Sequence, residues 1–183
     1  MSEAAREALA ALRVVEHALT ERHPEGPRPH PLSGRPDAPA AAVFRHGDAL
    51  SLISLDVRGE GPGEWSLGAT AVLALAGAEI DAALEWVNER NRRLSVGKYY
   101  CAHSREAGVA AIAYDTWVQG AAFGACSGAD EAGGRLATVL LAMVANVLDT
   151  GAAEAAQAAA AIGGRPPGDS EADRQALLVI ALG

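Results

Sequence analysis

Residues 85–104, EWVNERNRRLSVGKYYCAHS, decide the fold, because a helical pattern gives way to a strand pattern within them. The stretch crowds arginines, asparagines and adjacent tyrosines together. That mixture suits a nucleic-acid surface, a polar catalytic pocket, or a helix that leads into a strand. The spacing of its apolar residues favours the third interpretation.

Helical spacing over residues 79–94 predicts an amphipathic helix. Its expected apolar face comprises Ile80, Leu84, Val87 and Leu94. Asn91 falls at the centre of this face, where an unpaired amide would cost about 1–3 kcal/mol. We therefore expect Asn91, with Asn88 on its flank, to bond backbone groups of residues 95–98. Arg92 points outward near the helix C-terminus, where a cation offsets the helix dipole, so its structural role needs no ligand.

The segments around this helix alternate with a period of two, as half-buried strands do. Residues 40–57 predict two strands joined at 46–48, where a glycine between polar residues supplies the positive φ of a tight turn. Residues 64–77 predict a third strand, and residues 95–104 and 108–118 predict a hairpin. Strands that follow one another with short links pair antiparallel.

Two further helices are predicted from apolar residues at spacings of three and four, over 3–22 and 135–149. The second extends through alanine-rich residues 152–164, past a weak point at Gly151. The glycine-rich residues 124–134 before it read as a loop. The expected fold is therefore α+β, a single antiparallel five-stranded sheet with packed helices in the order α-β-β-β-α-β-β-α.

Length and composition bound the domain organisation. A chain of 183 residues is the size of one ordinary domain, and we expect that domain to span 1–162. Residues 23–39, rich in proline and glycine, predict a loop, and 163–183 predict a linker with a short apolar tail. The net charge of −8 argues against a non-specific nucleic-acid binder, which needs a basic surface.

Localisation is predicted to be cytoplasmic. Charged residues interrupt the apolar pattern of the first helix, which excludes a signal peptide there, and no apolar run reaches the roughly 18 residues of a membrane helix. The two cysteines, Cys101 and Cys126, suggest reduced thiols rather than a disulfide framework or a zinc site.

Catalytic and cofactor motifs are absent from the sequence. It holds no phosphate-binding loop, zinc-protease helix, nucleophile elbow or dinucleotide fingerprint, and its five histidines lack ligands at metal spacing. We expect no cofactor and no metal. The one catalytic alternative is a small enzyme with a pocket between sheet and helices that uses Cys101, His103 and Asp115.

Residues 83–120, ALEWVNERNRRLSVGKYYCAHSREAGVAAIAYDTWVQG, followed by a long apolar helix, resemble the YbjN-like family, in which an N-x-x-N helix end precedes a hairpin and the last helix. Asn88, Asn91 and Arg92 match that helix end. The family is related to type III secretion chaperones of the CesT kind. The resemblance implies the same element order over residues 3 to about 162.

The resemblance also implies a function: a non-enzymatic homodimer that binds a peptide or a protein client without inserting in a membrane. A sheet edge and shallow apolar patches suit that task. Trp65, Leu67 and Trp117 are the candidate client-binding residues, although a core position is the preferred explanation for each of them. Besides the enzyme, the remaining alternative is a signalling regulator that binds one folded partner.

Overall fold

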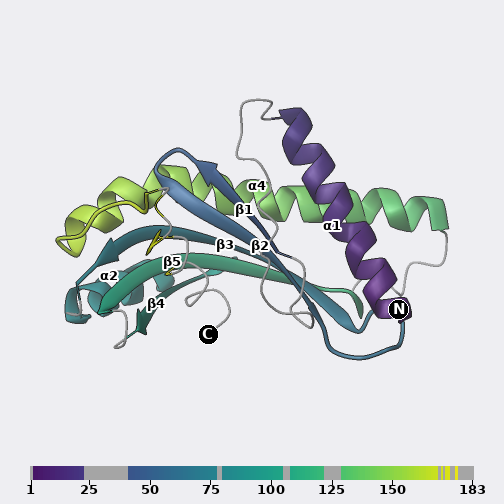
Figure 1. Ribbon diagram of the computed structural model, residues 1–183, viewed down its shortest axis with the longest axis horizontal. Helices are drawn as coiled ribbons and strands as arrows, with labels where there is room; N and C mark the ends of the chain where they lie inside the picture. The colour runs from purple at the N-terminus through teal and green to yellow at the C-terminus, as the bar shows by residue number, and fades with distance from the viewer. Residues whose placement is uncertain are drawn as a thin grey trace. The chain divides into compact units, whose positions relative to one another are not determined.

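The computed structural model describes residues 2–22, 41–77, 80–104, 108–121 and 129–168, together with 170, 172, 173 and 176. Figure 1 shows their arrangement into helices and strands. The elements in chain order are α1 (Glu3–Arg22), β1 (Ala41–His46), β2 (Ala49–Val57), β3 (Trp65–Ala76), α2 (Asp81–Asn91), β4 (Lys98–Ser104), β5 (Val109–Gln119) and α4 (Ala129–Ala161).

One five-stranded antiparallel sheet joins the strands in the order β1-β2-β3-β5-β4. The α+β class and the order α-β-β-β-α-β-β-α predicted from the sequence are therefore confirmed. Because β3 pairs with β5, the β4–β5 hairpin joins the meander in reverse order, and β1 and β4 become the two edges.

Contacts divide the chain into two compact units. The first comprises Met1–Phe44, Ile53–Ala69 and Trp117–Asn146, and the second Arg45–Leu52, Thr70–Thr116 and Val147–Gly183. Each is described by itself below. The single domain over 1–162 stays a prediction.

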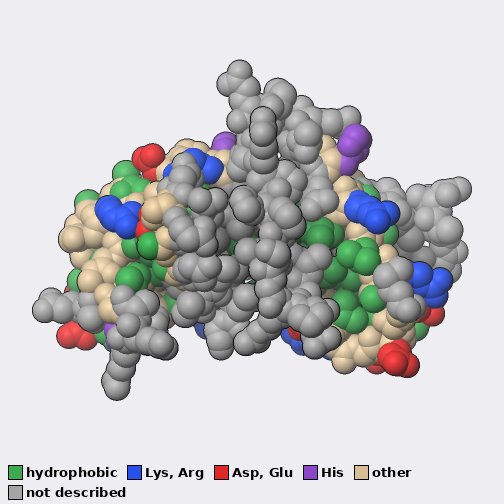
Figure 2. All heavy atoms as spheres, viewed as in Figure 1, with side chains coloured by type: hydrophobic (Ala, Val, Ile, Leu, Met, Phe, Trp, Pro, Cys, Tyr) green, Lys and Arg blue, Asp and Glu red, His purple; other side chains and the backbone are tan. Residues whose placement is uncertain are grey.

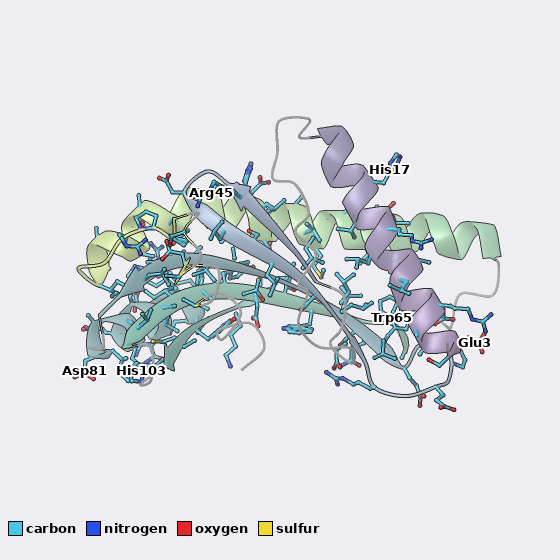
Figure 3. All side chains as sticks on the ribbon, viewed as in Figure 1. Glu3, His17, Arg45, Trp65, Asp81 and His103 are labelled. Atoms are coloured by element: carbon cyan, nitrogen blue, oxygen red, sulfur yellow. The ribbon has the colours of Figure 1, made fainter. Side chains whose placement is uncertain are left out.

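In the first unit, the buried face of α1, which consists mostly of small side chains, and the beginning of β3 form part of the core. The buried positions of α1 are Ala4, Ala8, Ala11, Leu12 and Val15. Glu7 on the same helix accepts hydrogen bonds from the backbone N–H of Gly63 at 2.8 Å and from Nε1 of Trp65 at 3.0 Å. Figure 3 shows Trp65 beside α1. One carboxylate thus ties the helix to the turn before β3 and to its first side chain.

In the second unit, α4 approaches the sheet at Gly151. A Cβ atom on this residue would lie 2.9 Å from Cβ of Ala71 and 3.1 Å from Cβ of Ala49, closer than such atoms pack. Gly151 is buried inside a continuous helix, so it is a point of close contact rather than the weak point that the sequence suggested. Small side chains on both surfaces allow this approach.

Residues that follow α4 return to the sheet. Arg165 and Leu75 exchange two backbone hydrogen bonds of 2.8 and 2.9 Å. The guanidinium of Arg165 also donates to both carboxylate oxygens of Asp173, at 2.9 and 2.7 Å, and Arg45 donates to the carbonyl of Pro167 at 2.9 Å. We call Arg165, Pro167 and Asp173 the C-terminal clasp. The predicted linker therefore holds a fixed connection to β3.

Several boundaries differ from those predicted. α4 begins at Ala129, inside the expected 124–134 loop, and α2 covers Asp81–Asn91 rather than 79–94. The predicted loop 23–39, the turn residues 105–107 and the tail from 177 lie outside the described residues. The turn predicted at 46–48 is confirmed, with Gly47 at a φ of 55°.

The buried face of α2 is also rotated from the predicted one. Ala83 and Val87 are buried, whereas Leu84 is 41% exposed. The physical reason is the large ring of Trp86, which packs against Tyr99 of β4 with ring centroids 5.3 Å apart. Placing that indole against the sheet turns Leu84 toward solvent.

Replacement of Gly151 by alanine tests the close approach of α4. Alanine favours a helix by about 1 kcal/mol over glycine, but its methyl group would overlap Ala71 and Ala49, and overpacking costs about 1–3 kcal/mol. We expect Gly151→Ala to lower the free energy of unfolding, measured by urea denaturation. The control is Gly77→Ala, because a Cβ at Gly77 meets nothing within 4 Å. A more stable Gly151→Ala variant would contradict the close contact.

The C-terminal clasp predicts a pH-dependent contribution to stability. The hydrogen bonds from Arg165 hold the pKa of Asp173 below its ordinary value. A carboxyl with a lowered folded-state pKa stabilises the fold above its unfolded pKa, about 3.9, and this contribution is lost as the pH falls through the folded value. We expect Asp173→Asn to be less stable by about 1–3 kcal/mol at pH 7, with a smaller difference at pH 2–3, in urea titrations.

The matched control for Asp173 is Asp56→Asn, because Asp56 pairs with Arg58 at 2.8 Å on an exposed surface. Exposed ion pairs contribute about 0–1 kcal/mol, so this variant should change stability little. If both variants lose the same unfolding free energy, the clasp contributes no more to stability than an exposed ion pair does.

Candidate functional site at the edge of strand β4

Strand β4 lies at one edge of the sheet, where β5 is its one partner among the described strands. Its antiparallel register runs without interruption from Lys98 opposite Asp115 to Ser104 opposite Val109. Figure 1 shows β4 beside β5, with α2 close to this hairpin. The backbone of an edge strand has N–H and C=O groups that no neighbouring strand occupies.

Asn91, the last residue of α2, covers one position on this edge. Its Nδ2 donates to the carbonyl oxygen of Tyr99 at 2.8 Å, and its Oδ1 accepts from the Tyr99 N–H at 2.9 Å. The carboxamide thus supplies one donor and one acceptor, as a residue of a neighbouring strand would. The predicted backbone bonding of Asn91 is confirmed, but the partner is Tyr99 rather than a residue within 95–98.

The Asn91–Tyr99 pair also shows which residues of β4 direct their backbone groups outward. In an antiparallel ladder, successive residues direct both backbone polar groups alternately toward the partner strand and away from it. Tyr99 faces away from β5, because both of its polar groups bond Asn91. Since the register is regular, Cys101 and His103 direct their N–H and C=O groups the same way. Among the described residues, no backbone group from a turn or loop bonds Cys101 or His103 there.

An aromatic cluster holds this edge in place. Tyr99 packs edge-on against Trp86 and lies 4.8 Å from Tyr114 between ring centroids. The hydroxyl of Tyr114 donates to the carbonyl of Val96 at 3.0 Å, which fastens the turn before β4. Gly97 in that turn has a φ of 76°, and a side chain there would overlap the Tyr114 ring. Burial, and secondarily the charge of Glu154, raises the pKa of Tyr99 to about 12, so the phenol stays neutral.

The outer side of α2 borders an open groove of about 970 Å³. Its lining residues are Ala82, Glu85, Trp86, Asn88, Glu89, Arg90, Arg92, Arg93 and Ala161. The guanidinium of Arg90 lies 4.9 Å above the Trp86 ring and donates to Oε1 of Gln157 at 2.6 Å. It also stands 3.2 Å from Oε2 of Glu154, close enough for an ion pair but without the alignment of a hydrogen bond. These contacts direct Arg90 toward α4 and leave the other arginines at the surface.

The residues of the catalytic alternative are not brought together. Cys101 lies opposite Ile112 and Lys98 lies opposite Asp115, so the alternation of side chains places Cys101 and His103 on one face of the sheet and Asp115 on the other. Burial raises the pKa of the Cys101 thiol, which disfavours the nucleophilic thiolate. Cys126 lies outside the described residues.

The three candidate client-binding residues differ in accessibility. Trp65 and Leu67 are buried. Trp117 is 45% exposed and lies over Gly68, where a Cβ atom would come within 2.7 Å of its ring. A glycine on the neighbouring strand therefore provides the flat surface on which this indole rests. Only Trp117 of the three presents its ring to solvent.

The helix-end residues have separate roles. Asn91 bonds the strand edge, Asn88 is exposed, and Arg92 is an exposed partner of Glu89 at 3.2 Å. Sequence reasoning missed Tyr99, Trp86 and Arg90 as the residues that position the edge. The spacing of Trp86 and Arg90 by four residues was the available signal, because such a pair meets on one helix face.

Other kinds of site find no support in the part of the chain that the structure describes. It contains no group of three or more histidine, cysteine or acidic side chains placed to hold a metal. None of the described helices combines the length and apolar character of a bilayer span. Figure 2 shows that, on the face of the molecule in view, the acidic and basic side chains of the described residues are dispersed.

Comparison with known proteins gives no identification. No protein-family model matches the chain, and no curated protein matches it.

The role of Asn91 is tested by comparing Asn91→Ala with Asn88→Ala. Loss of the Asn91 carboxamide leaves the Tyr99 N–H and C=O without their partner, so we expect a loss of about 1–3 kcal/mol in unfolding free energy. Hydrogen exchange of the Tyr99 amide should accelerate. The Asn88 variant should change stability by no more than about 0.5 kcal/mol, as exposed positions do. Similar effects in both variants would refute the edge-pairing role.

Proposed function

We propose that this chain is a non-enzymatic, cytoplasmic protein-binding adaptor or chaperone that takes up an extended segment of a client as an added strand along β4. The observation that carries the proposal is the outward direction of the Cys101 and His103 backbone groups on an edge strand. The resemblance of residues 83–120 to the YbjN-like and CesT-like proteins supports the same kind of function.

Strand addition suits this edge for a physical reason. Main-chain hydrogen bonds provide affinity that does not depend on the client's sequence, and alternate side chains of the client provide specificity. The aromatic cluster of Trp86, Tyr99 and Tyr114 holds β4 in a fixed conformation before the client arrives. A preformed edge reduces the ordering cost of binding.

Trp117 is a separate candidate contact. Its exposed ring in the first unit offers an apolar surface to a client side chain. Trp65 and Leu67 are both buried, so we assign them to the core rather than to contact with the client.

The alternatives make different predictions. An enzyme built on Cys101, His103 and Asp115 would require side chains from both faces of the sheet, which the β4–β5 register separates. A signalling regulator would bind one folded protein and show no affinity for extended peptides. The homodimer stays a prediction of the resemblance, and light scattering measures it. A strict monomer that retains no polypeptide in a pull-down would contradict the chaperone assignment.

Strand addition is tested by Cys101→Pro. Proline removes the outward N–H at this position, and it is tolerated on edge strands because the ladder to β5 does not use that group. The probe is a fluorescein-labelled decapeptide of alternating threonine and valine, followed by fluorescence anisotropy. We expect the proline variant to weaken binding at least tenfold.

Two controls accompany this experiment. Cys101→Ala removes the thiol but keeps the N–H, so it should bind the decapeptide as the parent does. A decapeptide N-methylated at alternate residues tests the same bonds with the parent protein, and it should bind at least tenfold more weakly. Equal binding of the methylated and unmethylated peptides would overturn strand addition.

A further inference from the structure

The end of β4 near Asn91 carries a local charge opposite to that of the whole chain. Residues 88–103 contain four cations and one acid, a net charge of +3, in a chain with a net charge of −8. One of these cations, Arg90, is directed toward Trp86, Glu154 and Gln157. We call the other three, Arg92, Arg93 and Lys98, the basic rim.

The basic rim lies next to the outward-facing backbone of β4. Lys98 is the first residue of the strand, and Arg92 and Arg93 follow directly after Asn91, whose side chain bonds Tyr99. The side chains of Arg92 and Arg93 are 76% and 74% exposed. A strand added beside Cys101 and His103 would therefore end close to these cations.

The acids near the basic rim meet it through exposed ion pairs. Arg92 and Arg93 share the single carboxylate of Glu89, at 3.2 and 2.6 Å. Lys98 lies opposite Asp115 in the register with β5. Glu85 lines the same groove as Arg92 and Arg93. Exposed ion pairs are weak enough to exchange partners, so these acids leave the cations available to a client.

We propose that the β4 edge selects extended client segments that are acidic, with the basic rim as the specificity-determining group. This inference rests on the proposed function and names the chemical class of its client. A cation at a strand edge also opposes pairing between identical edges. A second copy would bring the same positive residues to the edge, whereas an acidic segment complements them.

The test uses two labelled decapeptides that differ only in charge. Both keep the threonine–valine alternation, and one carries two glutamates at its ends where the other carries two lysines. At 50 mM NaCl we expect the glutamate peptide to bind at least tenfold more tightly than the lysine peptide, by fluorescence anisotropy. The difference should shrink at 500 mM NaCl, because salt screens exposed charges.

Matched variants assign the preference to the basic rim. The triple variant Arg92→Gln, Arg93→Gln, Lys98→Gln should bind the two peptides within about threefold of each other, since it leaves the sheet backbone unchanged. The control triple variant Arg6→Gln, Arg13→Gln, Arg58→Gln makes the same charge change at exposed positions of the first unit and should keep the preference. A preference that survives in the first variant, or disappears in the second, overturns the proposal.

The outcomes separate this inference from the proposed function. If both peptides bind equally and Cys101→Pro weakens both, strand addition stands and selection by charge is wrong. If neither peptide binds, the proposed function fails together with the inference. If light scattering shows a dimer that Cys101→Pro dissociates, the occupant of the edge is a second copy, and the acidic client is excluded.

Discussion

The pair of hydrogen bonds between the Asn91 carboxamide and the Tyr99 backbone is the constraint on which the β4 region depends. It joins the end of α2 to the edge of the sheet and occupies one of the outward-facing positions that the pairing with β5 leaves on β4. The aromatic contacts of Trp86, Tyr99 and Tyr114 surround that junction. A single polar side chain therefore holds the end of the helix against the edge strand, while the β4–β5 register sets the direction in which the backbone is offered to a partner.

Local sequence patterns predicted the elements that depend on local physics. The period of two and the glycine at position 47 indicated the first hairpin, and the position of Asn91 on its helix indicated a bond to the backbone. The exposure of Leu84 could not be predicted in the same way, because it follows from where the Trp86 ring finds room against β4. Helical periodicity alone does not rank two apolar faces that overlap.

Two further features could not be predicted from local sequence: the partner of Asn91, and the return of the chain to β3 after α4. The turn between α2 and β4 determines whether Asn91 meets residue 98 or 99, and turn geometry is weakly encoded in composition. The pairing of Leu75 with Arg165 joins segments far apart in the sequence and has no local signal. For the candidate site, the sequence indicated that Asn91 bonds the backbone, but it named Cys101 only in the catalytic alternative. It did not show that β4 is an edge strand, because strand order is a property of the whole sheet.

The C-terminal clasp has a consequence for how the protein is made. Leu75 lies in the first half of the chain, whereas Arg165 and Asp173 lie near its end. Synthesis proceeds from the N-terminus, so the end of β3 stays without these partners until residues 165–173 have left the ribosome. Closing so long a loop is also entropically unfavourable before the sheet and α4 are in place. The clasp is therefore a late contact in folding, made after all five strands of the sheet have been synthesised.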